Sequence, residues 1–109
     1  LLFTRELARK LAGSGVTVNA LHPGFVATRF AANSSGPFAS LIRFGKFFAI
    51  SPKKGAETLV FLASSSEVKD ITGEYFFKCK VKVPASQARD DEAARHLWKE
   101  STRLITESR

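Results

Sequence analysis

Residues 16–28 constrain the fold of this chain more than any other segment. They begin as a short, β-branched and largely uncharged run, which is typical of a strand covered on both faces of a sheet. The run ends at Pro23-Gly24, and the hydroxyl of Thr28 follows four residues after the glycine. Proline fixes its own φ and glycine permits a close backbone approach, so the chain should turn sharply there. The pattern predicts a strand that ends in a tight loop.

The residues before this strand predict a helix over 1–12. Phe3, Leu7 and Leu11 recur every four residues, and the charged residues take the other side. Glu6 and Lys10 are placed to form a pair one turn apart, and a glycine-rich turn at 13–15 should end the helix. A helix that returns through a short turn to a strand is half of a parallel βαβ unit. In such α/β sheets ligands lie beyond the carboxyl ends of the strands, which places residues 22–28 at the ligand edge.

Residues 29–50 are rich in phenylalanine and are broken by a polar stretch at 33–37. Short helices with an exposed apolar face are expected, and three interpretations stay open: the wall of an apolar pocket, a part of the core, or a membrane-surface segment. Ser51-Pro52 then predicts the start of a helix, with serine as its cap and proline in its first turn. That helix should bury one side, made of Ala56, Leu59, Val60 and Ala63.

The last third predicts one strand and one helix. Residues 71–77 are expected to form a turn and a final aromatic strand at or near the sheet edge, followed by a loop over 81–88. Asp90 and the two acids after it favour a helix start, because acids complement the helix dipole there. This helix should bury its apolar side, which consists of Ala94, Leu97, Trp98, Ser101, Leu104 and Ile105.

Charge and cysteine content narrow the function classes. The chain has 109 residues with 17 basic and 10 acidic side chains, a net charge of +7, but the basic residues are scattered, which disfavours a nucleic-acid partner. Cys79 is the only cysteine, so no internal disulfide and no zinc-ligand spacing is available, and a reducing compartment is expected. Charged residues interrupt any signal peptide at Leu1. The chain has no Met and begins in a helical pattern, so we expect a truncated sequence.

Three blocks in order resemble the short-chain dehydrogenase/reductase family, in its retinol-dehydrogenase-like branch. They are the His-Pro-Gly-x-Val-x-Thr loop from His22 to Thr28, the strand-like residues 72–80, and the helical residues 93–101. The resemblance covers the whole chain and implies the C-terminal part of a Rossmann-like, doubly wound parallel α/β sheet, incomplete as given. It divides the single domain into 1–28 (helix, strand and cofactor loop), 29–50 (substrate lid) and 51–109 (last helices and strand).

The resemblance also implies roles for residues. The nicotinamide-side loop would consist of Pro23, Gly24, Phe25, Val26 and Thr28. Phe30, Phe38 and Phe44 would contact the substrate. The implied cofactor is NADP(H), ahead of NAD(H), and the implied substrate is a small apolar alcohol or carbonyl such as a retinoid. His22 is expected to be a hydrogen-bonded scaffold residue, and the amide of Asn19 is expected to bond neighbouring backbone.

The departures from the family pattern concern catalysis. The chain has no glycine-rich phosphate loop and no Tyr-x-x-x-Lys, and its one tyrosine, Tyr75, lies in the final strand. The catalytic Ser, Tyr and Lys therefore lie outside this chain, and the chain alone is predicted to be inactive and, with open strand edges, prone to aggregate. The alternative is a non-catalytic binding or membrane-associated module that uses the basic aromatic segment 38–50. The cytosol, or the cytosolic face of an intracellular membrane, is the expected location.

Overall fold

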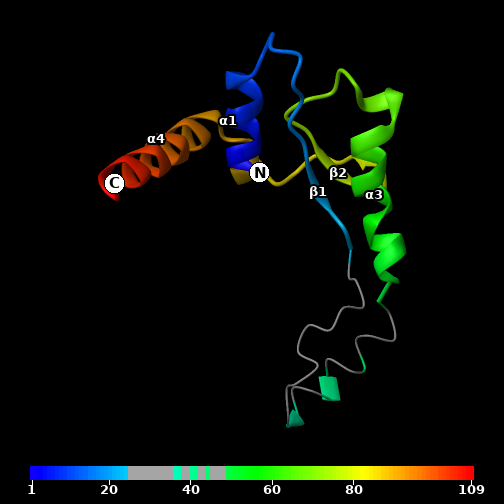
Figure 1. Cartoon of the computed structure of the whole chain (residues 1–109). Coiled ribbons are helices and arrows are strands. Elements are labelled where there is room, and N and C mark those ends of the chain that lie inside the picture. The colour runs from blue at the N-terminus through cyan, green and yellow to red at the C-terminus, as the bar shows by residue number, and fades with distance from the viewer. Residues whose placement is uncertain (25–35, 38–39, 42–43, 45–48) are drawn as a thin grey trace.

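A computed structural model of the chain describes residues 1–24, 36–37, 40–41, 44 and 49–109. In these residues helices flank a small mixed sheet, so the fold is α/β, a part of a Rossmann-like sheet (Figure 1). The elements are α1 (Leu2–Lys10), β1 (Ala20–His22), α3 (Pro52–Ser64), a 3₁₀ turn (Ser66–Val68), β2 (Tyr75–Phe77), β3 (Lys80–Val81), a second 3₁₀ turn (Ser86–Arg89) and α4 (Asp91–Glu107). The predicted helices at 1–12, after Ser51-Pro52 and after Asp90 are confirmed.

The sheet has the order β1-β2-β3 in the described part of the chain. β1 and β2 are parallel, with Leu21 opposite Phe76, while β2 and β3 are antiparallel, with Phe76 opposite Val81. The predicted strand, β2, lies beside the edge strand β3, which agrees with a position near the edge, but it is not the last strand of the described sheet. The prediction of a loop from residue 81 misses β3, because the two-residue turn Lys78-Cys79 lacks the Asn-Gly signal of a tight hairpin.

β1 is shorter than predicted, because the residues before Ala20 bond to the chain ahead of β2 partly through side chains. Thr72 Oγ1 accepts from the backbone N–H of Val18 at 2.9 Å. The Asn19 side-chain amide donates to the Ile71 carbonyl at 2.8 Å, and its oxygen accepts from the Glu74 N–H at 3.1 Å, which confirms the backbone-bonding role. The strand is less covered than expected: Ala20 and Leu21 are half-buried and His22 is exposed.

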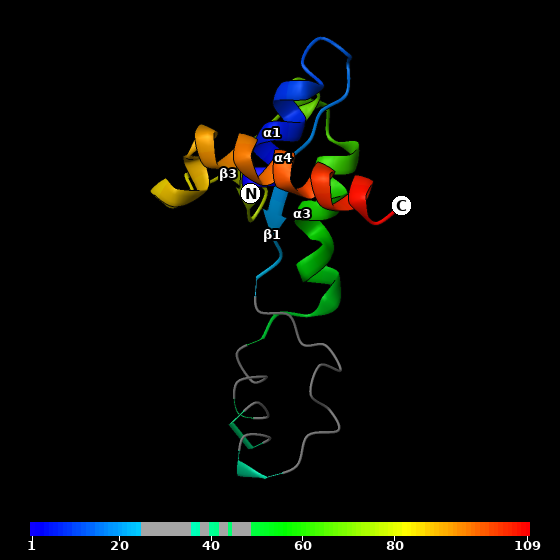
Figure 2. The same cartoon turned by 90° about the vertical axis from the view of Figure 1, so that its left-hand side faces the viewer.

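α1 and α4 pack against each other, and α4 extends away from the sheet (Figures 1 and 2). The rings of Phe3 and Trp98 stack at 5.0 Å, and Arg5 forms an ion pair of 2.6 Å with Asp91. The packing buries part of the charged side of α1: Glu6 is 4% exposed, whereas Phe3, which contacts α4 through Trp98, is 49% exposed.

Glu6 lies closer to another cation than to the expected partner, Lys10. The predicted pair with Lys10 is present at 3.8 Å, but the guanidinium of Arg9 lies closer, at 2.6 Å. The hydrogen bonds from Arg9 hold the pKa of Glu6 below its usual value, and those from Arg5 do the same for Asp91. In their charged form, Glu6 therefore stabilises α1 itself and Asp91 stabilises the contact between α1 and α4.

α4 buries less of its apolar side than predicted. Its start is confirmed: the Asp90 carboxylate accepts from two backbone N–H groups of the first turn, at 2.9 and 3.0 Å. Ala94 is 1% exposed, but Leu97, Leu104 and Ile105 are 41, 58 and 60% exposed. The reason is that α4 continues outward past α1, so α1 covers only its first half (Figure 2).

α3 packs on one face of the sheet through a different side from the predicted one. The Ser51 hydroxyl accepts from the Lys54 N–H at 3.2 Å, which confirms the cap. Thr58 is buried, whereas Leu59 and Val60 of the predicted side are 59 and 60% exposed. The predicted side is wrong because Phe61 of α3 contacts Phe76 of the sheet, with ring centroids 6.5 Å apart, and this turns the Leu59-Val60 side outward.

The described residues form a small core. Phe76 is the largest fully buried side chain, and Ala8, Val68 and Ala94 are the other buried hydrophobic residues. None of the helices in the described ranges is long and apolar enough to cross a bilayer.

Acid should destabilise α1 and its contact with α4. The pKa values of Glu6 and Asp91 are lowered on folding, so their stabilisation is complete above the ordinary carboxyl range of about 4 and is lost as pH falls through the lowered values. We expect the melting temperature, followed by circular dichroism, to be constant between about pH 7 and 5 and to fall below pH 4.

The double variant Glu6→Gln and Asp91→Asn is the control for this expectation. It should melt lower than the wild type at pH 7 and show a flatter acid limb. An equally steep acid limb in the double variant would assign the pH dependence to other carboxylates.

Candidate cofactor-side cavity

A cavity of about 440 Å³ lies where β1 and β2 end. Pro23 and Gly24, directly after β1, form one wall, and Phe77 to Cys79, at the end of β2, form another. The first turns of α3, with Ile50 before them, close the cavity. Its position at the carboxyl ends of two adjacent parallel strands is the usual ligand position in open α/β sheets, and its volume suits a small-molecule site.

Gly24 has a backbone conformation that suits only glycine here. Its φ is +86°, and a Cβ on this residue would lie 3.2 Å from Ile50 Cδ1. The Gly24 N–H donates to His22 Nδ1 at 2.8 Å, and the His22 ring meets Phe77 edge-on at 5.5 Å between centroids. The scaffold role predicted for His22 is confirmed: its side chain holds the loop and packs on β2.

The opposite wall is fixed by Thr58 of α3. Lys78 and Cys79 both have positive φ, 50° and 59°, as a two-residue hairpin turn of this hand requires. The backbone N–H of Cys79 donates to the buried Thr58 hydroxyl at 3.1 Å, and the Cys79 sulfur lies 3.8 Å from the same oxygen. This contact joins the β2–β3 turn to α3 and keeps both on one side of the cavity.

The polar groups of the cavity suit an anionic ligand that carries hydrogen-bond donors. Lys54 and Lys78 contribute two ammonium groups against the one carboxylate of Glu57. Because Gly24 N–H is already bonded to His22 and proline has no N–H, the described loop offers carbonyl acceptors rather than donors. A ligand group with N–H or O–H donors is the kind that such acceptors would bind.

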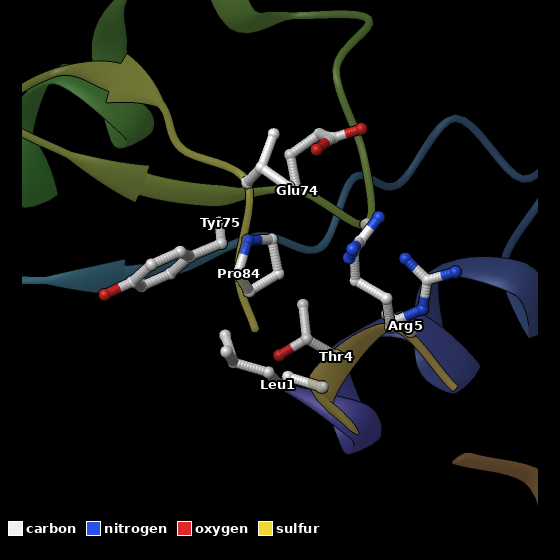
Figure 3. A pocket seen from close by; sticks show the side chains of 10 residues that line it. Leu1, Thr4, Arg5, Glu74, Tyr75 and Pro84 are labelled. Carbon is white, nitrogen blue, oxygen red and sulfur yellow. The ribbon is translucent and has the colours of Figure 1, made fainter. Parts of the chain in front are cut away.

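A second cavity, of about 250 Å³, lies at the start of β2, away from the strand ends (Figure 3). Leu1, Thr4 and Arg5 of the α1 end face Tyr75 and Pro84 across it. Arg5 is occupied by Asp91, and the position is at the amino end of the strand, where open α/β sheets do not place their ligands. In the ranges that the structure describes, no His, Cys, Asp and Glu side chains gather into a group that could hold a metal ion.

Comparison with known proteins identifies the family of this chain. The profile of the family described as Enoyl-(Acyl carrier protein) reductase matches residues 1–78. Human retinol dehydrogenase 13 is 45% identical over 95% of this chain, and human retinol dehydrogenase 14 is 43% identical over 90%. The chain belongs to the short-chain dehydrogenase/reductase family. Human WW domain-containing oxidoreductase is a more distant relative, 37% identical over 98% of the chain. The chain spans about a third of the retinol dehydrogenases, 33% and 30% of their lengths.

The short-chain dehydrogenase/reductase loop is only partly described by the structure. Pro23 and Gly24 line the cavity, and their contact with a cofactor stays a prediction. The other predicted positions lie outside the described residues; they are Phe25, Val26, Thr28, Phe30 and Phe38. Phe44 is described, is 70% exposed and is not among the residues that line the cavity, so its predicted substrate contact has no support in this geometry.

Sequence reasoning missed the wall of the cavity that Ile50 and the first turns of α3 form. Ile50, Lys54, Glu57 and Thr58 line it, although they were not singled out. The Ser51-Pro52 pair could have indicated these residues, because it fixes where the first turn of α3 begins. That this turn lies across the cavity from Gly24, however, depends on tertiary structure.

Proposed function

We propose that this chain forms the nicotinamide side of an NADP(H)-dependent oxidoreductase that interconverts an alcohol and a carbonyl. The observation that carries the proposal is the cavity at the ends of β1 and β2, lined by Pro23 and Gly24 of the family loop. When bound, the nicotinamide would give or accept a hydride. Pro23 and Gly24 would contact the carboxamide, and Phe25, Val26 and Thr28 would extend this loop, as the family resemblance implies. The two lysines favour an anionic cofactor but do not select NADP over NAD.

The proposed substrate is a retinoid or another small lipid-like molecule. The names of the similar retinol dehydrogenases support this class, and so does the apolar composition of residues 29–50, which we assign as the substrate lid. Residues 1–28 would then supply the cofactor loop, and 51–109 the helix and strands behind it. We place the protein in the cytosol or on the cytosolic face of an intracellular membrane.

A chimera tests the proposed function. The corresponding last third of human retinol dehydrogenase 13 is replaced by this chain, so that the catalytic residues missing here come from the relative. We expect the chimera to reduce retinal with NADPH, followed by the loss of NADPH absorbance, and the isolated 109 residues to show no turnover.

Two controls accompany the chimera. Retinol dehydrogenase 13 truncated before the replaced third should be inactive, which shows that the graft is required. A folded chimera without turnover on retinal or other apolar carbonyls would contradict the proposal, as would turnover by the isolated chain.

A second candidate is a membrane-associated module that uses residues 38–50. The observation in its favour is the high exposure of Leu41 and Phe44, 67% and 70%. Exposed bulky apolar groups beside cations suit an interfacial segment. The two candidates are compatible, because a dehydrogenase of lipid-like substrates gains from contact with the membrane that holds them.

A further inference from the structure

Four lysines form one cluster beside the mouth of the cavity. The ammonium groups of Lys78 and Lys82 lie 5.3 and 5.0 Å from the centroid of the Phe77 ring. Lys54 lines the cavity together with Lys78. Lys80 is on β3, between Lys78 and Lys82 in the sequence, and is opposite Phe77 in the strand register. We call Lys54, Lys78, Lys80 and Lys82 the lysine rim; all four are exposed.

The charge of the lysine rim is not neutralised by the described part of the chain. None of the four lysines forms an ion pair with a described residue. By contrast, Arg5, Arg9, Lys10 and Arg103 are each paired with a carboxylate. Glu57 also lines the cavity, so four positive charges face one negative charge there, and the remaining excess creates a local positive potential, which attracts an anionic surface.

We propose that the lysine rim docks the mouth of the cavity onto a bilayer rich in anionic phospholipid. The inference rests on the proposed function, because a lipid-like substrate would reach the cavity from such a surface. Lys80 is opposite Phe77 in the register, and Lys78 and Lys82 also approach the Phe77 ring, so the three lysines of the β2–β3 hairpin lie around one side chain. Clusters of lysines of this size are attracted to the negative surface of a bilayer that contains anionic lipid.

The same lysines are poorly arranged for nucleic acid. The only aromatic ring among them, Phe77, is covered by two ammonium groups and meets His22 at its edge. It therefore offers no free face on which a base could stack, and single-strand binders depend on such faces. Lysines also act as point charges, which suits the headgroups of a fluid bilayer.

The test is co-sedimentation of the full 109-residue chain with vesicles. Phosphatidylcholine vesicles are compared with vesicles that contain phosphatidylserine, at low and at high salt. We expect binding only to the anionic vesicles, with loss at high salt because screening weakens exposed charges. The variant K54Q/K78Q/K80Q/K82Q should bind at least tenfold more weakly.

A matched variant separates a local site from net charge. K69Q/R95Q/K99Q/R109Q removes the same number of charges at exposed positions on other elements. It should keep most of the binding, and circular dichroism checks that both variants fold as the wild type does. Equal losses in the two variants would overturn the proposal, as would equal binding to neutral vesicles, or displacement from anionic vesicles by single-stranded RNA at lower phosphate concentration.

The vesicle assay contains no cofactor, so its result does not depend on dehydrogenase activity. An inactive chimera together with intact lysine-dependent binding would reject the proposed function and keep the docking surface. An active chimera, together with a chain that shows no lysine-dependent binding, would support the proposed function and reject the docking surface.

Discussion

Replacing Phe76 with alanine should reduce the free energy of unfolding by about 3–5 kcal/mol, the largest stability loss expected from one substitution in this chain. Phe76 is 1% exposed and is the largest fully buried side chain. It lies on the central strand β2, between Leu21 of β1 and Val81 of β3 in the register, and it contacts Phe61 of α3. Its removal leaves a cavity where sheet and helix meet, and few other buried side chains can compensate.

Urea unfolding followed by circular dichroism measures this loss. A loss of this size is a large part of the stability of even a complete small domain, so the variant should lose most of its unfolding transition. Leu104→Ala on α4 is the control, because Leu104 is 58% exposed and alanine favours the helix, so the midpoint should move little. A Phe76→Ala midpoint as close to the wild type as that of the control would show that the β2–α3 contact does not hold the fold together.

Features that depend on neighbouring residues could be predicted from the sequence. Ser51 and Asp90 cap their helices as expected, because a cap needs only a side-chain acceptor and the next free N–H groups. Asn19 and His22 bond backbone near the ends of β1, as their polar groups at a strand position require. The Pro23-Gly24 turn lies at the ligand edge, because the carboxyl end of a parallel strand fixes that position.

Features that depend on distant segments could not be predicted. Glu6 is buried because α4 packs against α1, and no local pattern encodes that packing. β2 is central because Lys78 and Cys79 adopt positive φ without glycine, a turn whose usual sequence signal is absent. The cavity wall from Thr58 depends on one hydrogen bond to Cys79, 21 positions along the chain. The apolar side of α4 is expected to be buried along its whole length, yet Leu104 and Ile105 are exposed. Helical periodicity indicates which side of a helix is apolar, but not how far a partner helix extends along it.

Gly24→Val in the chimera with retinol dehydrogenase 13 should lower kcat/KM by about 100-fold, with the larger part in the KM for NADPH. A side chain at φ +86° is strained, and its Cβ would lie 3.2 Å from Ile50 Cδ1, so the loop or Ile50 must shift. Either shift changes the wall of the cavity that Pro23, Gly24 and Ile50 form. A displacement of about 1 Å at a positioning group can cost two orders of magnitude in rate.

Gly13→Val is the matched control for this variant. Gly13 has a similar φ of +80°, but a Cβ there meets nothing within 4 Å, and the residue lies in the turn after α1, not in the cavity. Both variants carry the strain of a side chain at positive φ, so their melting temperatures should fall by comparable amounts. Only Gly24→Val should raise the KM for NADPH, measured at a temperature where both variants are folded. If Gly13→Val raised it equally, the effect would reflect stability; if neither did, Pro23-Gly24 would not contact the cofactor.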